Sequence, residues 1–240
     1  MNEPRDAREP SEPAVLRLAE DATGFGAVEL RTARDLLLRP RAVLEAYLTL
    51  GATGGGRYAR PLRFYLALCG VLMVILFLTG INISRMEEVP PDVLGELVTL
   101  SGKTTDGFIA DVENWISLVL VPVMSLFYAL GMVPLLKFWD RSTDWRRAFR
   151  ACFALLCAWT IVMIPFSPWL YRRELVVPSL VFMVMVLIIS FLRMGRGRWW
   201  RSGWGAAGRS LLLVLTIVIL NLIGPIPIVV IALLGGVYAP

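Results

Sequence analysis

Five long runs that contain no Asp, Glu, Lys or Arg limit this 240-residue chain to very few folds. Each run is long enough to cross the hydrocarbon core of a membrane, which takes about 20 apolar residues in an α-helix. The chain is also 57% hydrophobic, which exceeds what one soluble core of this size can bury. We therefore expect an all-α membrane protein built as a bundle of five transmembrane helices. The expected spans are residues 62–84, 115–136, 151–171, 175–193 and 210–234.

The turn between the third and fourth predicted spans is short, and the fourth span is the shortest of the five. Its sequence, FSPWLYRRELVVP, places the charged residues 172–174 at the tip. A hairpin that enters only part of the bilayer is therefore an alternative to two complete spans in this region.

The basic residues predict the orientation, because Lys and Arg near span ends resist translocation while acidic residues count for little. Twenty of the 24 basic residues lie in residues 1–63, 137–150 or 193–209, which are all expected to face the same side. The N-terminus is therefore expected in the cytoplasm and the C-terminus outside. The other four basic residues are Arg85, Lys103, Arg172 and Arg173.

The chain outside the spans is expected to be short and simple. Residues 1–13 are rich in proline and charge and are expected to be disordered. Residues 14–56 are expected to form short amphipathic helices on the cytoplasmic leaflet, followed by the membrane domain at residues 57–240. The clearest apolar face, in RPRAVLEAYLTL, consists of Val43, Leu44, Tyr47 and Leu48.

Residues 85–114 are expected to form an extracytoplasmic loop, with seven acidic and two basic residues. Within it, apolar residues at helical spacing predict two short amphipathic helices lying on the outer surface, the second leading to Trp115. The acidic character is expected to reflect a solvated loop, and the alternative is a cap that gathers cations or a basic partner.

Two basic and aromatic stretches are candidates for anchoring spans at the membrane interface. In RYARPLRFY, residues 57–65, arginines recur every three residues, so that their long side chains can reach lipid headgroups. Aromatic residues favour the same interfacial level. The second stretch is RGRWWRSGW, residues 196–204. The predicted anchors are Arg57, Tyr58, Arg60, Arg63, Tyr65, Trp199 and Trp200.

Other readings of the basic and glycine-rich segments are weaker. GATGGGRY lacks the Lys-Ser/Thr pair of a phosphate-binding loop. GWGAAG has the spacing of a dinucleotide fingerprint, but no strand precedes it and spans lie on both sides. RGRWWRSGW would suit base stacking in a soluble protein, yet here it joins two spans. We expect contact with anionic lipid headgroups and no nucleic-acid partner.

The chain lacks the residues that most membrane enzymes and ion-coupled transporters use. It has no histidine, and its three cysteines, Cys69, Cys152 and Cys157, all fall within predicted spans. Apart from Arg63 and Arg193 at the ends of two spans, no Asp, Glu, Lys or Arg lies inside a predicted span, where proton relays and ion sites are usually found. The sequence therefore predicts no catalytic residue, no metal site and no cofactor.

A polar residue followed by two prolines marks the fifth predicted span. Asn221 precedes Gly224, Pro225, Ile226 and Pro227, and the prolines remove two backbone donors. The expected role of this segment is a structural kink in which Asn221 satisfies freed carbonyl groups. The alternative is a transporter site, because a broken helix with free polar backbone can bind a substrate.

One part of the chain resembles a known family. LRTARDLLLRPRAVLEAYLTLGATGGGRYARPLRFYLAL, followed by NWISLVLVPVMSLFYALGMVPLL and a basic loop, is similar to a bacterial membrane family, domain of unknown function 3667. The shared features are an Arg-Pro turn and an Arg-Tyr-x-x-Pro entry to the first span. Family members often carry a histidine motif or a cysteine knuckle, and this chain has neither. Its five spans also resemble Yip-type trafficking proteins, without their signature motifs.

Two function classes follow. The first is a non-catalytic membrane protein that acts as a scaffold, binds a membrane-protein partner or its own copy, or associates with lipids. The alternative is a small permease that uses the broken fifth helix, which would require a polar cavity at Asn221. With 22 arginines and two lysines, the composition is typical of a GC-rich bacterial genome, so the expected location is the inner membrane.

Overall fold

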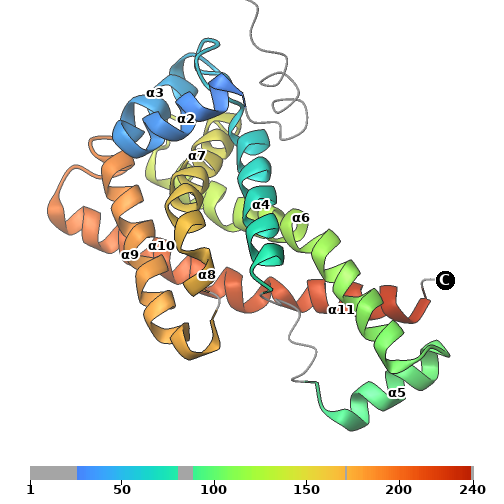
Figure 1. The fold of residues 1–240 in the computed structure, drawn as a ribbon. Helices are drawn as coiled ribbons and strands as arrows, with labels where there is room; N and C mark the ends of the chain where they lie inside the picture. The colour runs from blue at the N-terminus through green and yellow to red at the C-terminus, as the bar shows by residue number, and fades with distance from the viewer. Residues whose placement is uncertain (1–25, 81–88, 171, 239–240) are drawn as a thin grey trace, which may run out of the picture.

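A computed structural model gives the structure of residues 26–80, 89–170 and 172–238, which form helices and connecting turns (Figure 1). The predicted disordered tail at residues 1–13 lies outside the described residues. The α-helices are α2 (Ala27–Leu38), α3 (Pro40–Thr49), α4 (Pro61–Leu78), α5 (Pro91–Ser101), α6 (Thr105–Trp139), α7 (Trp145–Met163), α8 (Ser167–Leu170), α9 (Val176–Gly195), α10 (Gly203–Ile223) and α11 (Pro225–Tyr238).

Among the described residues, five helical segments are long and apolar enough to cross a membrane, which confirms the predicted all-α fold with five spans. The fourth, α9, has 20 residues and is about 30 Å long at 1.5 Å per residue, enough for a complete crossing. The segments are Pro61–Leu78, Thr105–Trp139, Trp145–Leu170, Val176–Gly195 and Gly203–Tyr238.

The second span begins earlier than expected. We predicted a separate surface helix before Trp115, whereas α6 runs without interruption from Thr105. The Thr104 hydroxyl accepts a hydrogen bond from the backbone N–H of Gly107 and so caps the helix at this point. The apolar residues that we assigned to the outer surface lie instead on a protein contact with α11.

This contact forms a small second core at the end of the molecule that carries the C-terminus (Figure 1). Its buried side chains come from the first turns of α6 and from α11, with apolar residues of α5 packed against them. Gly236 allows the close approach, because a Cβ there would lie 2.6 Å from Val112. Lys103 ties the helices together through Asp111 at 2.6 Å and the carbonyl of Gly236 at 3.0 Å. The buried members are Phe108, Val112, Ile116, Ile228 and Ala232.

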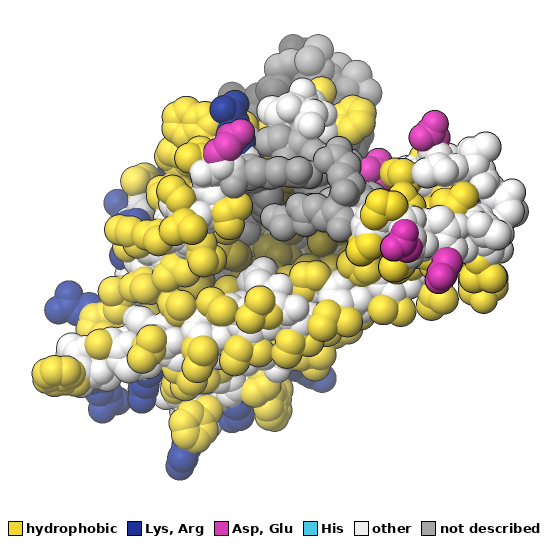
Figure 2. Space-filling model, turned by 90° about the horizontal axis from the view of Figure 1, so that it is seen from below, with side chains coloured by type: hydrophobic (Ala, Val, Ile, Leu, Met, Phe, Trp, Pro, Cys, Tyr) yellow, Lys and Arg dark blue, Asp and Glu magenta, His cyan; other side chains and the backbone are white. Residues whose placement is uncertain are grey.

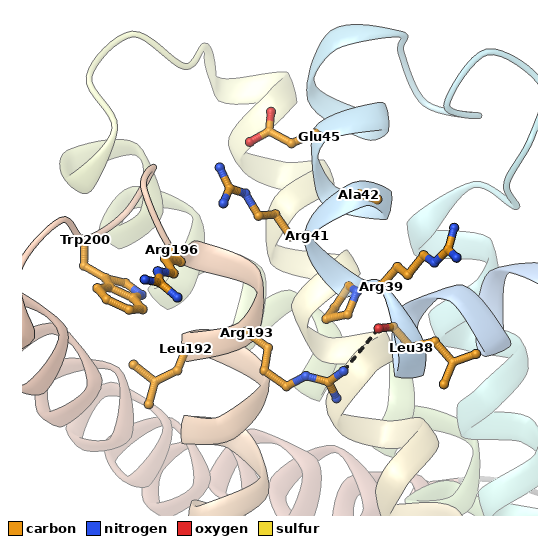
Figure 3. Close-up of a pocket in the computed structure, with 10 residues that line it drawn as sticks. Leu38, Arg39, Arg41, Ala42, Glu45, Leu192, Arg193, Arg196 and Trp200 are labelled. Atoms are coloured by element: carbon orange, nitrogen blue, oxygen red, sulfur yellow. Dashed lines mark hydrogen bonds between the residues drawn. The ribbon is translucent and has the colours of Figure 1, made fainter.

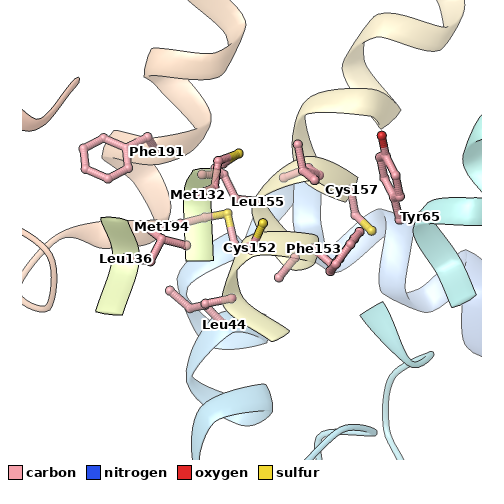
Figure 4. Close-up of a cluster of buried hydrophobic side chains, with 14 of the residues drawn as sticks. Leu44, Tyr65, Met132, Leu136, Cys152, Phe153, Leu155, Cys157, Phe191 and Met194 are labelled. Carbon is pink, nitrogen blue, oxygen red and sulfur yellow. The ribbon is translucent and has the colours of Figure 1, made fainter. Parts of the chain in front are cut away.

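The main core surrounds α7. Every residue from Ala151 to Ala158 is buried, because α7 contacts α2, α3, α4, α6 and α9. Figure 4 shows Cys152 and Leu155 among side chains from other helices, including Met132 and Phe191. The three cysteines are free and buried in this apolar surrounding.

Helices α2 and α3 form, with residues 50–60, a helical cap on the bundle. The predicted apolar face of α3 is correct, since Val43, Leu44, Tyr47 and Leu48 are all almost completely buried. However, they pack on α7 and α9 and not on lipid. Our expectation that lipid covers this face was therefore wrong, because an amphipathic pattern identifies an apolar face without identifying what covers it.

Charged side chains separate along the molecule. Figure 2 shows Lys and Arg gathered toward one end, and several Asp and Glu at the opposite end. The basic end contains the helical cap and the two loops at residues 140–144 and 196–202. The acidic end contains α5 and the first turns of α6. Basic and acidic residues that the sequence assigned to opposite sides of the spans thus lie at opposite ends of the molecule.

The glycine-rich turn of the cap has a defined shape. Gly51, Gly54, Gly55 and Gly56 all have positive φ, and a Cβ at Gly54 would lie 2.7 Å from the Tyr58 ring. We expect Gly54→Ala to lower the free energy of unfolding by about 1–3 kcal/mol, through backbone strain and this clash. Gly56→Ala is the matched control, because its φ is also positive and no atom lies within 4 Å. Thermal unfolding of the purified proteins would show the difference, and equal losses would contradict the clash.

Candidate functional site

The backbone of the predicted anchor stretch is held by side chains of the cap. The N–H of Ala59 donates to the hydroxyl of Thr32 at 2.9 Å, and its carbonyl accepts from the hydroxyl of Tyr47 at 2.6 Å. Both contacts are buried. The Tyr58 hydroxyl donates to the carboxylate of Asp35 at 3.3 Å, and its ring meets Tyr47 edge-on. The entry to the first span is therefore locked to α2 and α3.

Two of the predicted anchors are inside the protein. Tyr65 is 5% exposed and packs against Phe153, and Trp199 is 2% exposed and stacks on Phe191. Their assignment to the membrane interface was wrong, because neighbouring helices cover both rings. Tyr58 and Trp200 are half-buried in the basic end.

The three anchor arginines, Arg57, Arg60 and Arg63, have exposed side chains. An interfacial anchor needs positive charge, which lysine supplies equally well, whereas a bidentate anion site needs the guanidinium fork. We expect the triple change to lysine to leave abundance and insertion nearly unchanged, and the triple change to glutamate to reduce abundance several-fold. Quantitative blotting of membrane fractions would measure both. Loss of a cellular phenotype in a normally inserted lysine variant would contradict the anchor interpretation.

Arg198 connects three separate segments at the basic end. Its guanidinium contacts Asp140 at 2.7 Å, Glu45 at 3.1 Å and the hydroxyl of Thr143 at 3.4 Å. Burial opposes ionisation of Asp140, but hydrogen bonds from Ser142 and Thr143, together with Arg198, outweigh it and lower the pKa of this carboxyl. A lowered carboxyl pKa stabilises the fold at neutral pH, and this contribution is lost only in acid, below the ordinary aspartate range.

Two further arginines attach the cap to the spans. Arg150 of α7 donates to the carbonyl of Tyr47 at 2.8 Å, and Arg193 of α9 donates to the carbonyl of Leu38 at 3.3 Å. Both carbonyls lie at or near the C-terminal ends of cap helices, where carbonyl groups lack intrahelical partners. Several basic residues that the sequence marked only as topology signals therefore hold the cap in place.

Arg193 and three further arginines of the basic end line a pocket between α3 and α9, which we call the arginine pocket. Its volume is about 760 Å³. Figure 3 shows the side chains of Arg41 and Arg196 on its two sides, with Arg193 below them, whereas the guanidinium of Arg39 points away. The lining residues are Leu38, Arg39, Pro40, Arg41, Ala42, Glu45, Leu192, Arg193, Arg196 and Trp200.

A second basic cavity of about 600 Å³ lies on the other side of the loop at residues 196–202. Trp200 lines both cavities, and its buried indole Nε1 has no hydrogen-bond partner within the described part of the chain. Four arginines line the second cavity as well: Arg141, Arg198, Arg201 and Arg209.

Asn221 lies within helix α10 and not in an unwound segment. Its side-chain amide donates to the carbonyl of Ile217 at 2.8 Å, and its oxygen accepts from the Tyr128 hydroxyl at 3.1 Å. Only Gly224 separates α10 from α11, and its backbone is helical, with φ −58° and ψ −37°. The predicted break at Gly224, Pro225 and Pro227 is therefore a joint between two nearly continuous helices.

The cavity beside Asn221 is small and apolar. It has a volume of about 300 Å³, and Asn221 contributes the one polar amide of its lining. A permease that binds a polar substrate at this depth would need several convergent polar groups. The remaining lining residues are Trp159, Leu180, Met183, Val184, Leu187, Ile217, Val218 and Leu222.

Comparisons with protein-family models, with curated proteins and with solved structures find no match for this chain. The resemblances stated above therefore remain expectations. What the helices define is the class: a multi-pass membrane protein with five apolar helical spans.

The arginine pocket was difficult to predict from the sequence. Arg41 and Arg196 are 155 positions apart, and each was counted only as a positive charge near a span. One local signal was present, since Arg39-Pro40-Arg41 opens a helix and so places positive charge at a helix N-terminus, where proteins often bind anions.

Proposed function

We propose that this protein is a non-catalytic, lipid-associated protein of the bacterial inner membrane, with its basic end in the cytoplasm. The main support is that the arginines of that end fall into two groups. Some, such as Arg150 and Arg198, are engaged in holding the fold together. Others, such as Arg41 and Arg196, have exposed side chains beside a pocket.

Physical chemistry favours lipids as the partner of these arginines. The cytoplasmic leaflet is negatively charged, and each Lys or Arg held near it contributes about 1 kcal/mol of attraction. The proposal also rests on the absence of histidine from the whole sequence and of Asp, Glu, Lys and Arg from the five long apolar runs. The apolar lining at Asn221 favours this proposal over a permease.

The proposal predicts that anionic lipid stabilises the protein. In nanodiscs with 30 mol% phosphatidylglycerol, we expect a melting temperature several degrees above that in phosphatidylcholine alone, because a ligand of the native state raises its stability. Raising the salt concentration to about 0.5 M is expected to reduce the difference, because salt screens exposed charges. Equal melting temperatures in the two lipids at low salt would contradict the proposal.

A further inference from the structure

We propose that the arginine pocket binds the phosphate headgroup of an anionic phospholipid. This inference rests on the function proposed above and names its site. The phosphate would lie between the start of α3 and the end of α9, with the acyl chains following α9 into the membrane. The size of the pocket, about 760 Å³, falls within the usual range for sites of small ligands.

Positive side chains outnumber negative ones around the pocket. Three arginines, Arg41, Arg193 and Arg196, line it together with Arg39, whose guanidinium points away, against one carboxylate, that of Glu45, which already pairs with Arg198 at 3.1 Å. Within residues 26–80, 89–170 and 172–238, neither Arg41 nor Arg196 forms an ion pair. A bound anion would offset the repulsion between these like charges.

The guanidinium groups approach from opposite sides. Arg41 reaches across from α3 to the loop after α9, since a Cβ on Gly197 would lie 3.4 Å from its Nη2 atom. Figure 3 shows Arg196 on the side of α9, next to Trp200. Arg193 uses one contact on the carbonyl of Leu38 and keeps further N–H donors. Planar forks of this kind bind phosphate through paired hydrogen bonds.

The start of α3 also favours an anion. Its first turn, with Pro40, Arg41 and Ala42, lines the pocket and lacks a side-chain cap. The positive end of this ten-residue helix is therefore uncapped at the pocket.

The apolar side of the pocket distinguishes a lipid from a soluble phosphate compound. Leu192 lies at its edge, and three exposed apolar residues follow on the same face of α9 toward its N-terminus. They are four residues apart from one another, and the first lies three residues from Leu192, so all lie on one face of the helix. Acyl chains that leave the pocket would lie along this stripe, which consists of Ile189, Met185 and Val181.

The test uses purified full-length protein in a neutral detergent and the short-chain lipid dioctanoyl phosphatidic acid. The pocket variant is R41Q with R196Q. The matched control is R31Q with R146Q, which removes two exposed arginines of the basic end outside the pocket. Thermal shift titrations are expected to show an affinity at least tenfold weaker in the pocket variant and less than threefold weaker in the control.

Two further measurements distinguish a lipid phosphate from a soluble phosphate compound and control for misfolding of the variants. Glycerol 3-phosphate, which has the phosphate without acyl chains, is expected to bind the unaltered protein at least tenfold more weakly than phosphatidic acid. R41K with R196K keeps the charge, and its affinity for phosphatidic acid is expected to be about threefold weaker or more, because lysine lacks the planar guanidinium fork.

Equal losses in the pocket variant and its control would overturn the pocket while leaving a general preference for anionic lipid intact. Equal binding of glycerol 3-phosphate and phosphatidic acid would overturn the lipid assignment. Absence of any stabilisation by anionic lipid in the unaltered protein would instead remove the proposed function itself.

Discussion

A reporter enzyme that is active only outside the cytoplasm is expected to be active when fused after Pro240 and silent when fused after Gly195. The physical reason is the distribution of positive charge, since 20 of 24 basic residues lie on the side predicted to remain in the cytoplasm. The expected difference is all-or-none, because each fusion point lies on one side of the membrane or the other.

The matched control for these fusions is a second reporter that is active only in the cytoplasm, which should give the opposite pattern at the same two positions. A fusion after Gly102, at the end of α5, should behave like the one after Pro240. The reverse pattern with both reporters would contradict the orientation, and with it the placement of the arginine pocket at the cytoplasmic leaflet.

Changing Leu44 to alanine is expected to lower the free energy of unfolding by about 2–5 kcal/mol, the usual range for truncating a buried leucine. Leu44 is completely buried where α3 packs on the bundle. The cap should also open more often, so that a protease cuts the glycine-rich turn at residues 51–56 faster. Thermal unfolding and limited proteolysis of the purified protein in detergent would measure the two effects.

Leu50→Ala is the control, because Leu50 lies just beyond the same helix and is 58% exposed. It is expected to change stability by less than about 0.5 kcal/mol. If α3 instead lay on lipid, Leu44→Ala would weaken the contact of one helix with the membrane and leave the stability of the bundle unchanged. Equal behaviour of the two variants would therefore contradict a docked cap.

The spans could be predicted from sequence because crossing a bilayer depends on a local property, the length of a charge-free run. The start of α6 was harder to predict, since Asp111 and Glu113 made its first turns resemble a loop. Those turns pair with α11 at the acidic end, and a contact between segments more than 100 residues apart leaves no local pattern.

The apolar face of α3 was predicted correctly and its partner was not, for the same kind of reason. Period and polarity identify the side of a helix that avoids water, and both lipid and protein satisfy that requirement. The same reason explains Tyr65 and Trp199, which are buried. An aromatic residue near the end of a span suits the membrane interface or the protein core equally well, and only the positions of neighbouring helices decide between them.

The order of synthesis gives the docked cap a further consequence. The cap is synthesised before the spans, yet the groups that hold it are made much later: Arg150 follows Tyr47 by 103 residues, and Arg193 follows Leu38 by 155. Until α9 has been synthesised, the apolar face of α3 lacks its final partners, and a transiently exposed apolar face of this kind favours aggregation. Docking of the cap therefore depends on contacts that only the nearly complete chain can make.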